Sequence, residues 1–459
     1  MTIYALSTAP GRAAIAVIRV SGPQTVAAVE ALTGRPPPKP RQAALRQLSH
    51  PQDNTPLDEG LVLFFAAPQS YTGEDMAEFH VHGGVSVVRS VLAALAEMDG
   101  LSPAEPGGFT RLAVLNGRFD LTRAEGIADL IDAETEAQQN QAFRQMRGAL
   151  GALYDGWRGR LVKALAHLEA DIEFADEDLP GGIGKAVLAD MQLLSEEIEA
   201  HLAQTRGQTL RDGIEVAIIG APNVGKSSLL NRLAGREAAI VSARAGTTRD
   251  IVEVTMTLGG VPVVVADTAG IRAAGDEIER EGVRRARKRA ADADIRLFVS
   301  SPDVDATFLQ ENALHHESGN ENGNAEPPGD GLEVVARPGD FHIANKIDLQ
   351  KPAANSAGSA ETWRVSAKNG EGLPAFMAAL EKAVQNRYGL SEHPLLTRTR
   401  YRQALEAALI ALHRALAASD LELVGEDMRL AMRELGRITG AVDVEALLDV
   451  VFRDFCIGK

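Results

Sequence analysis

The sequence predicts a multidomain protein that combines α/β and all-α parts, and two observations lead to this class. Short apolar runs typical of strands occur near the N-terminus and again between about residues 213 and 385. The stretches on either side of the later region are rich in Ala, Leu, Glu and Arg and have helical spacing. Because each helical stretch alone is short for a stable core, we predict one helical domain interrupted by an inserted α/β domain.

The N-terminal domain is predicted to be mixed α/β and to cover residues 1–118. An apolar run at 13–20 and a second at 61–65 indicate strands. The segment 78–84 alternates between polar and apolar residues until two glycines end it, and the spacing over 86–98 predicts an amphipathic helix.

The helical domain is predicted in two halves, residues 119–212 and residues 386–459. The insert, residues 213–385, alternates strands with helices, which is the pattern of a parallel sheet. A low-complexity segment within it, residues 317–331, has too few apolar residues to bury and is predicted to be a disordered surface loop. One helical face of the first half is formed by Leu161, Ala164, Leu165, Leu168 and Ile172.

The composition excludes several classes of protein. No apolar run reaches the roughly 18 residues of a membrane span, and the N-terminus does not have the pattern of a secretory signal. One cysteine, Cys456, cannot form an intramolecular disulfide or a cysteine-based zinc site, which is typical of the cytoplasm. With a net charge of −16 and 4% aromatic residues, any contact with nucleic acid must be local.

A phosphate-binding loop is predicted directly after the apolar run 215–219. The loop reads Gly220-Ala221-Pro222-Asn223-Val224-Gly225-Lys226-Ser227, the pattern G-x-x-x-x-G-K-S, and a helix follows. Its glycines allow backbone N–H groups to converge on phosphate oxygens at the positive end of that helix. We expect Lys226 to neutralise the β- and γ-phosphates and Ser227 to bind Mg²⁺. The strand–loop–helix context argues against a Gly-rich turn without a ligand.

Three further motifs follow in the order that a GTPase needs. Asp267-Thr268-Ala269-Gly270 ends an apolar strand; Asp267 is expected to hold Mg²⁺ through water, and the Gly270 N–H to sense the γ-phosphate. Asn345-Lys346-Ile347-Asp348 carries a carboxylate that can accept from guanine N1 and N2, a donor pair that adenine lacks. Ser366-Ala367-Lys368 is expected to place a backbone N–H near guanine O6. Together they predict a P-loop GTPase domain of the Ras-like type that prefers GTP to ATP.

The water-orienting residue departs from the Ras-like pattern. In Ras-like GTPases a glutamine follows the Asp-Thr-Ala-Gly run, but here Ile271 occupies that position and cannot bind water. Glu279 is our candidate for this role, and a solvated acidic helix start is the alternative. The run 246–250, Gly-Thr-Thr-Arg-Asp, lies where a switch loop belongs, which makes Thr248 the expected second hydroxyl on Mg²⁺.

Taken together, these motifs resemble one family, the tRNA-modification GTPases called MnmE or TrmE. The resemblance also rests on Gly11-Arg12 with Ile18-Arg19-Val20-Ser21-Gly22, on Tyr71-Thr72-Gly73-Glu74-Asp75 and on the C-terminal Phe455-Cys456-Ile457-Gly458-Lys459. It covers essentially the whole chain. The GTPase motifs alone occur in many GTPases, whereas their combination with both ends of the chain is specific.

The resemblance implies a homodimeric cytoplasmic GTP hydrolase. With a flavin-dependent partner, MnmG or GidA, such proteins add a carboxymethylaminomethyl group to carbon 5 of the wobble uridine of certain tRNAs. It also implies an N-terminal domain that supports dimerisation and binds 5,10-methylene- or formyl-tetrahydrofolate. Potassium would stimulate hydrolysis, since a monovalent cation can supply the positive charge of an arginine finger, and none is evident here.

The resemblance also implies roles for individual residues, added to those above. In the family the P-loop asparagine, here Asn223, coordinates K⁺, and a loop-capping side chain is the alternative reading. Ser242, Arg244 and Thr247 complete the K⁺ cage, and Glu279 matches the water-orienting glutamate. The folate pattern falls on Arg19, Glu78, Arg118 and Lys459, where charge and hydrogen-bonding capacity suit a pterin and carboxylates; without the resemblance, surface salt bridges would be preferred.

The nucleotide site predicted from these motifs and from the resemblance includes residues of several separate segments of the chain. It consists of Asn223, Val224, Gly225, Lys226, Ser227, Ser228, Ser242, Ala243, Arg244, Ala245, Gly246, Thr247, Thr248, Asp267, Thr268, Ala269, Gly270, Asn345, Lys346, Asp348, Ser366, Ala367 and Lys368.

Several alternatives stay open on sequence alone. Cys456 is either a catalytic nucleophile or a small buried hydrophobe. The basic runs 284–289 and 397–402 are candidates for contact with tRNA phosphates; for the first run, a solvated helix face or a dimer contact is the preferred alternative. The GTPase could act as a ribosome-assembly switch without modification chemistry, or the helical domain could be a passive scaffold whose GTPase only times assembly.

Overall fold

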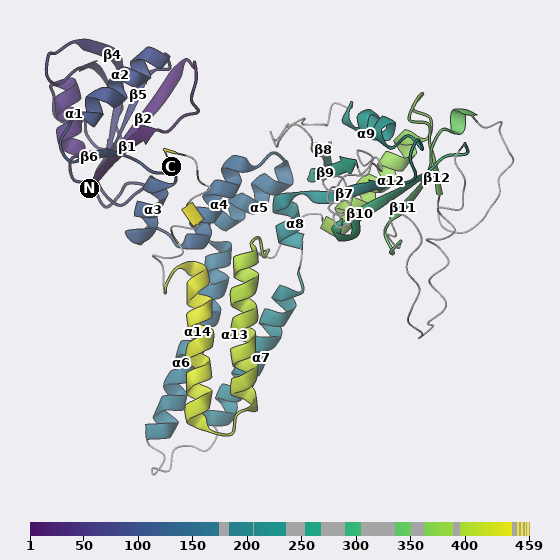
Figure 1. Ribbon diagram of the computed structural model, residues 1–459. Helices are drawn as coiled ribbons and strands as arrows, with labels where there is room; N and C mark the ends of the chain where they lie inside the picture. The colour runs from purple at the N-terminus through teal and green to yellow at the C-terminus, as the bar shows by residue number, and fades with distance from the viewer. Residues whose placement is uncertain are drawn as a thin grey trace, which may run out of the picture. The chain divides into compact units, whose positions relative to one another are not determined.

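The computed structural model describes residues 1–173, 183–204, 206–235, 253–267, 290–303, 336–349, 362–388, 395–442, 448, 451–452, 455 and 457–458. These residues belong to two compact units (Figure 1). The first unit comprises residues 1–132, 142–203 and 399–459, and the second comprises residues 133–141 and 204–398. No helix of the described part is long and apolar enough to span a bilayer. The domain boundaries predicted above stay predictions.

The N-terminal part of the first unit is a six-stranded sheet with the order β3-β4-β5-β2-β1-β6. Helices α1 and α2 cover one face, where the side chains of Val29, Phe79 and Leu95 are fully buried in a common core. The mixed α/β class predicted for this part is confirmed. Its elements are β1 (Thr2–Leu6), β2 (Ile15–Ser21), α1 (Thr25–Thr33), β3 (Ala44–Ser49), β4 (Pro56–Phe65), β5 (Met76–His82), α2 (Val85–Ala96) and β6 (Leu101–Pro103).

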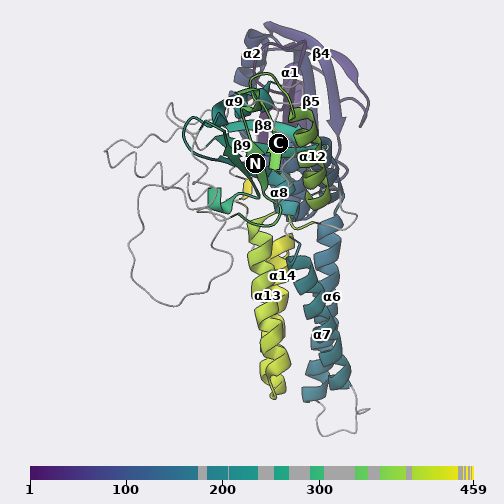
Figure 2. The same cartoon turned by 90° about the vertical axis from the view of Figure 1, so that its right-hand side faces the viewer.

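The rest of the first unit is helical. Helix α13 packs against α14 and α7, and α6 packs against α14 and α7, so that these long helices run side by side (Figures 1 and 2). The predicted apolar face of α6 is confirmed, because Leu161 and Leu168 are at most 2% exposed; the Ile172 side chain is not among those described. The helices are α3 (Gly108–Leu115), α4 (Leu121–Asp132), α5 (Glu136–Met146), α6 (Ala149–Glu173), α7 (Ile183–Leu202), α13 (Thr399–Ala417) and α14 (Leu421–Thr439).

The second unit contains a six-stranded sheet with the order β12-β11-β10-β7-β9-β8. The prediction of a parallel sheet is correct for five strands and wrong for β8, which pairs antiparallel with β9. Gly259 and Gly260 join these two strands with φ of 58° and 82°, values suited to a tight hairpin turn. The elements are α8 (Arg206–Asp212), β7 (Ile214–Ile219), α9 (Lys226–Ala234), β8 (Glu253–Leu258), β9 (Val261–Asp267), β10 (Ile295–Ser300), β11 (Phe341–Ala344), the 3₁₀ helix η3 (Ile347–Leu349), β12 (Thr362–Arg364) and α12 (Leu373–Tyr388).

The beginning of α5 belongs to this second unit. Ala137 is buried in the same core as Leu210 and Val216. The amide groups of Gln138 and Gln141 donate to the backbone oxygens of Arg211 (3.0 Å) and Gly207 (3.2 Å). A helix that is distant in sequence therefore closes one side of the second unit.

Candidate functional site

The predicted nucleotide motifs meet at one edge of the second sheet. Strands β7, β9, β10, β11 and β12 are parallel, so their carboxyl ends lie on the same side. Gly220 follows β7, Asp267 ends β9, Asn345 follows β11, and Ser366 comes two residues after β12. Ligand sites of open parallel sheets form at this edge.

The phosphate loop has the backbone that its glycines predict. A Cβ atom on Gly220 would lie 2.3 Å from the backbone oxygen of Val299, which leaves no room for a side chain. Gly225 has a φ of 94° and precedes the first turn of α9. Lys226 is 6% exposed, and its Nζ donates to the backbone oxygens of Gly220 (2.6 Å) and Ala221 (2.9 Å). The ammonium group therefore folds back over the loop, where phosphate oxygens would meet it.

Asn345 links this loop to the motifs predicted to read the base. Its side chain is buried, its Nδ2 donates to the Val224 backbone oxygen at 2.9 Å, and its Oδ1 accepts from the Ala367 N–H at 3.0 Å. A Cβ atom on Gly225 would approach Asn345 Nδ2 to 2.4 Å. The amide thus holds three chain segments in fixed positions.

Other residues of the motifs predicted to read the base are also paired. Asp348 Oδ1 accepts from the Ser366 hydroxyl at 2.6 Å, which orients the carboxylate. Lys346 has a φ of 60°, and its Nζ lies 2.7 Å from Asp303 Oδ2. This hydrogen bond, with one from Ser301, lowers the pKa of Asp303. Asp303 belongs to no sequence motif, and its place just after an apolar strand was the only local signal for it.

The residues predicted to bind metal ions are described only in part. Ser227 is exposed in the first turn of α9, and Asp267 ends the neighbouring strand β9, in register with Ile218 of β7. Hydroxyl and carboxylate oxygens are the donors that Mg²⁺ prefers, so these residues fit that ion. Asn223, the K⁺ candidate, is exposed with a φ of 66°. The other calls near the phosphates lie outside the described residues: 242–248, 268–270, Glu279 and the basic run 284–289.

A second candidate site lies on the N-terminal sheet, on the face opposite α1 and α2. It is a cavity of about 420 Å³, large enough for a cofactor-sized molecule. Its lining combines charged, aromatic and apolar side chains: Arg19, Arg41, Phe65, Gln69, Ser70, Tyr71, Met76, Glu78 and Ile127.

Two of the four predicted folate residues line this cavity as an ion pair. Arg19 and Glu78 face each other across β2 and β5, and Arg19 Nη2 lies 2.8 Å from Glu78 Oε1. His80 Nε2 is 3.2 Å from Glu78 Oε2. The Tyr71 ring lies 5.7 Å from the Arg19 guanidinium, and burial raises the pKa of Tyr71. The pair is therefore held between a histidine and an aromatic wall.

The C-terminal tail reaches the same ion pair. The Gly458 backbone oxygen accepts from Ser7 Oγ at 2.9 Å and from Arg19 Nη1 at 3.5 Å. Arg118, the third predicted folate residue, is exposed beside Gly73 and does not line the cavity. Cys456 and Lys459 lie outside the described residues, as does the low-complexity segment 317–331.

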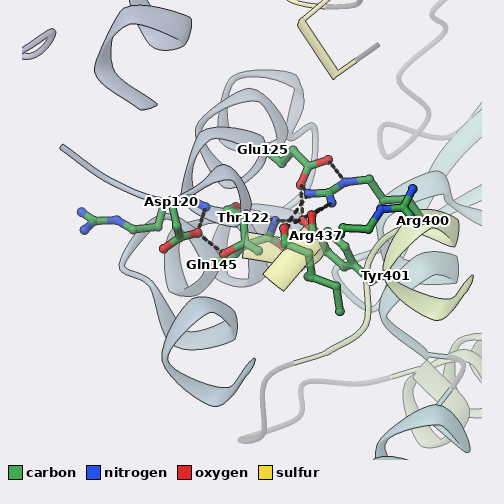
Figure 3. Close-up of polar contacts among 9 residues, drawn as sticks. Asp120, Thr122, Glu125, Gln145, Arg400, Tyr401 and Arg437 are labelled. Atoms are coloured by element: carbon green, nitrogen blue, oxygen red, sulfur yellow. Dashed lines mark hydrogen bonds and ion pairs between the residues drawn. The ribbon is translucent and has the colours of Figure 1, made fainter. Parts of the chain in front are cut away.

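Arg400, which belongs to the basic run predicted to contact tRNA phosphates, binds a buried carboxylate instead, and the prediction is wrong for this residue. Figure 3 shows Arg400 of the run 397–402 bound to Glu125, with Nε–Oε1 at 2.9 Å. Arg400 also donates to the Ile438 backbone oxygen at 3.1 Å. The Glu125 side chain is 2% exposed, so this guanidinium neutralises a buried carboxylate and is not available to tRNA phosphates.

The sheet, the phosphate loop and the converging strand ends define a P-loop nucleotide-binding protein. Residues 121–456 match the MnmE helical domain, and residues 2–118 match the N-terminus of the GTP-binding protein TrmE. The chain therefore belongs to the MnmE family of tRNA modification GTPases.

Individual relatives agree with this assignment. The tRNA modification GTPase MnmE of Parvibaculum lavamentivorans is 53% identical over 463 residues, covering 100% of both chains. The 5-taurinomethyluridine-tRNA synthase subunit GTPB3, mitochondrial, of Danio rerio is 44% identical, covering 100% of this chain and 93% of the relative. Among solved structures, Era in complex with MgGDPNP and 16S ribosomal RNA nucleotides is 24% identical, with a TM-score of 0.27, covering 45% of this chain and 68% of that chain. The sequence relatives, not this last likeness, establish the family.

Proposed function

We propose that this GTP hydrolase is stimulated by K⁺ and, with a flavin-dependent partner of the MnmG type, adds a carboxymethylaminomethyl group to carbon 5 of the wobble uridine of certain tRNAs. The observation that carries the proposal is full-length similarity to tRNA modification GTPases at 53% identity. The relative named as a taurinomethyluridine synthase subunit supports uridine as the modified base. We further propose a cytoplasmic homodimer in which the second unit is an insertion into the helical domain.

The described residues supply the positioning that GTP hydrolysis needs. Lys226 and the N–H groups of the first turn of α9 bind the β- and γ-phosphates, whose negative charge grows in the transition state. Asp348 reads guanine N1 and N2 while Ser366 fixes its orientation. Glu279, which lies outside the described residues, is assigned to orient the attacking water in place of the glutamine of Ras-like enzymes.

Two cations complete the proposed nucleotide site. Ser227, Thr248 and, through water, Asp267 hold Mg²⁺; Asn223 holds K⁺ with Ser242, Arg244 and Thr247. When bound, these ions supply positive charge beside the phosphates. The fixed left-handed backbone of Asn223 supports its role, because it presents the side chain at the exposed tip of the phosphate loop.

We assign a tetrahydrofolate, in its formyl or 5,10-methylene form, to the cavity on the N-terminal sheet. Glu78 is a carboxylate that can accept from the amide-like donors of a pterin, and Arg19 holds it in place. The Gly458 contact with Arg19 brings the tail to this ion pair, which supports a role for Lys459. Arg118 completes the proposed set of folate residues. The folate supplies a one-carbon unit when it is bound.

The direct test is the composition of wobble nucleosides in cells that lack the protein. We expect the carboxymethylaminomethyl substituent to disappear and to return with the wild-type chain but not with Glu279→Gln. Unchanged nucleosides in the deletion strain would contradict the modification function. Normal modification by a hydrolysis-deficient Glu279→Gln would show that hydrolysis serves another process, such as ribosome assembly.

A separate assay tests the K⁺ site. The GTPase rate of the pure protein should be higher in KCl than in NaCl at equal ionic strength, and Asn223→Ala should abolish the difference. Equal rates in the two salts would contradict the K⁺ assignment, whereas the proposed modification function would be unaffected.

A further inference from the structure

Arg41 lines the cavity on the N-terminal sheet and extends from a backbone turn. Among the described residues, the non-glycine positions with positive φ are Arg41, Asn54, Asn223 and Lys346. Asn54 lies in the turn between β3 and β4, and the last two belong to the nucleotide motifs. Arg41, with a φ of 64°, follows Pro40 in the turn 39–42, in which the Gln42 N–H donates to the Lys39 backbone oxygen at 3.0 Å. A positive φ at the third position is typical of such a turn, which fixes the point from which the Arg41 side chain leaves the backbone.

The contacts that hold Arg41 direct its side chain along the cavity. Its N–H donates to the Phe64 backbone oxygen at 2.8 Å, and its Nη2 donates to the Gln69 backbone oxygen at 2.6 Å. Its guanidinium lies 5.8 Å from the centre of the Phe65 ring. Arg41, Phe65 and Gln69 all line the cavity of about 420 Å³ described above.

The two arginines that line this cavity differ in whether a carboxylate neutralises their charge. Arg19 is paired with Glu78 at 2.8 Å, so its charge is largely compensated. Arg41 is exposed, and within the described part of the chain no carboxylate pairs with it; its partners are a carbonyl and an aromatic ring. The lining therefore carries an excess positive charge in a protein whose net charge is −16, which favours an anionic ligand at Arg41.

The sheet register separates this cation from the Arg19–Glu78 pair. Glu78 pairs with Leu63, and Met76, two residues along β5, pairs with Phe65. Two residues of strand span roughly 7 Å. A ligand of this length could therefore donate hydrogen bonds to Glu78 at one end and present a carboxylate to Arg41 at the other. Its aromatic or apolar middle part would lie against Met76 and Phe65.

We infer that Arg41 binds the carboxylates of the glutamate tail of the folate and so selects complete folates over simple pterins. This inference rests on the proposed folate site and adds to it a specificity-determining residue. A guanidinium suits the role because it can bind a carboxylate through two parallel hydrogen bonds while its face stays on Phe65.

The test uses the full-length protein and calorimetric titration with 5-formyl-tetrahydrofolate and with 6-methyl-tetrahydropterin, which lacks the benzoylglutamate. Arg41→Asn removes the charge with a residue that tolerates a φ of 64°. We expect it to weaken folate binding about 10- to 100-fold and to leave pterin binding unchanged. Arg41→Lys should fall between, and Arg35→Asn, an exposed arginine outside the cavity lining, should match the wild type.

The possible outcomes separate the two assignments. If the wild type binds folate and Arg41→Asn binds it equally well, the role of Arg41 is wrong and the folate site stands. If the variant, folded by circular dichroism, loses folate and pterin to the same extent, the assignment to the glutamate tail is wrong. If the wild type binds no folate, the proposed folate site fails and the inference with it.

Discussion

Asn345 illustrates at the scale of one residue how the nucleotide site is held. Its buried amide bonds the Val224 backbone oxygen on one side and the Ala367 N–H on the other. The sequence predicted that the loops of these two residues belong to one site, because the motifs have a characteristic order. It could not predict this pairing, which depends on how closely two strand ends approach in space.

The proposed base-reading role of Asp348 leads to the first prediction. Asp348→Asn replaces a carboxylate, proposed to accept from guanine N1 and N2, by an amide that also donates. We expect GDP affinity to fall at least about tenfold, and xanthosine diphosphate, whose ring carries a carbonyl at position 2, to bind better than to the wild type. Displacement of a fluorescent nucleotide measures both. Asp212→Asn, which removes an exposed carboxylate of α8 before β7, is the control and should change the preference little.

His201 leads to a second prediction at this scale, concerning pH. Burial, with a smaller effect of Arg402, lowers the pKa of His201 to about 4 from its usual 6.5. The unfolded chain therefore takes up a proton at this residue below about pH 6.5, whereas the folded chain does so only near pH 4. The free energy of unfolding should fall by about 1.4 kcal/mol per pH unit between these values from this group alone.

Thermal unfolding at pH 7 and pH 5 checks the His201 prediction. His201→Gln does not titrate and can still bond the Tyr154 hydroxyl, which lies 3.1 Å from His201 Nε2. The loss of stability between the two pH values should be smaller in this variant. His413→Gln, which removes a half-exposed histidine of α13, should behave like the wild type. An equal pH effect in both variants would contradict the assignment to His201.

At the scale of elements, one polar cluster joins the helices of the first unit. Glu125 of α4 binds Arg400 and Tyr401 at the start of α13, and Arg400 also binds the last carbonyls of α14 (Figure 3). Gln145 of α5 donates to the Thr122 backbone oxygen and to the Tyr401 hydroxyl. The sequence predicted these helices from their periodicity, but it placed Arg400 in a basic surface because a partner 275 residues away leaves no local pattern.

This cluster leads to a prediction about stability. Glu125→Ala should lower the free energy of unfolding of the first unit by about 3–5 kcal/mol, since it leaves the Arg400 guanidinium without its buried counter-charge. Glu169→Ala is the matched control: it also removes a glutamate bound to an arginine, but that pair is half-exposed. Its cost should stay within about 1 kcal/mol. Chemical denaturation followed by circular dichroism compares them, and equal losses would show that the cluster contributes little.

At the scale of the whole molecule, the sequence predicted the structural class of each region better than the direction and bounds of its elements. Motifs with fixed spacing identified the nucleotide sheet, yet β8 was expected to be parallel, because apolar composition does not encode strand direction. The N-terminal strands β1, β3 and β6 had no distinct pattern: β1 and β6 have 5 and 3 residues, and β3 has one fully buried residue, Leu48, among half-buried and exposed positions. The participation of residues 133–141 in the second unit depends on contacts distant in sequence.

The two tryptophans of the chain allow the two units to be followed separately. Trp157 is buried in α6 of the first unit, and Trp363 lies in β12 of the second. In the Trp157→Phe variant, the fluorescence of Trp363 follows the unfolding of the second unit. In the Trp363→Phe variant, the fluorescence of Trp157 follows the unfolding of the first unit. Mg²⁺ and GDP at about 100 times the dissociation constant should stabilise the unit that binds them by about 2.7 kcal/mol. We therefore expect a higher unfolding midpoint from Trp363 and an unchanged midpoint from Trp157. If both midpoints rise together, the two compact units unfold as a single cooperative structure, and nucleotide binding stabilises the helical region as well.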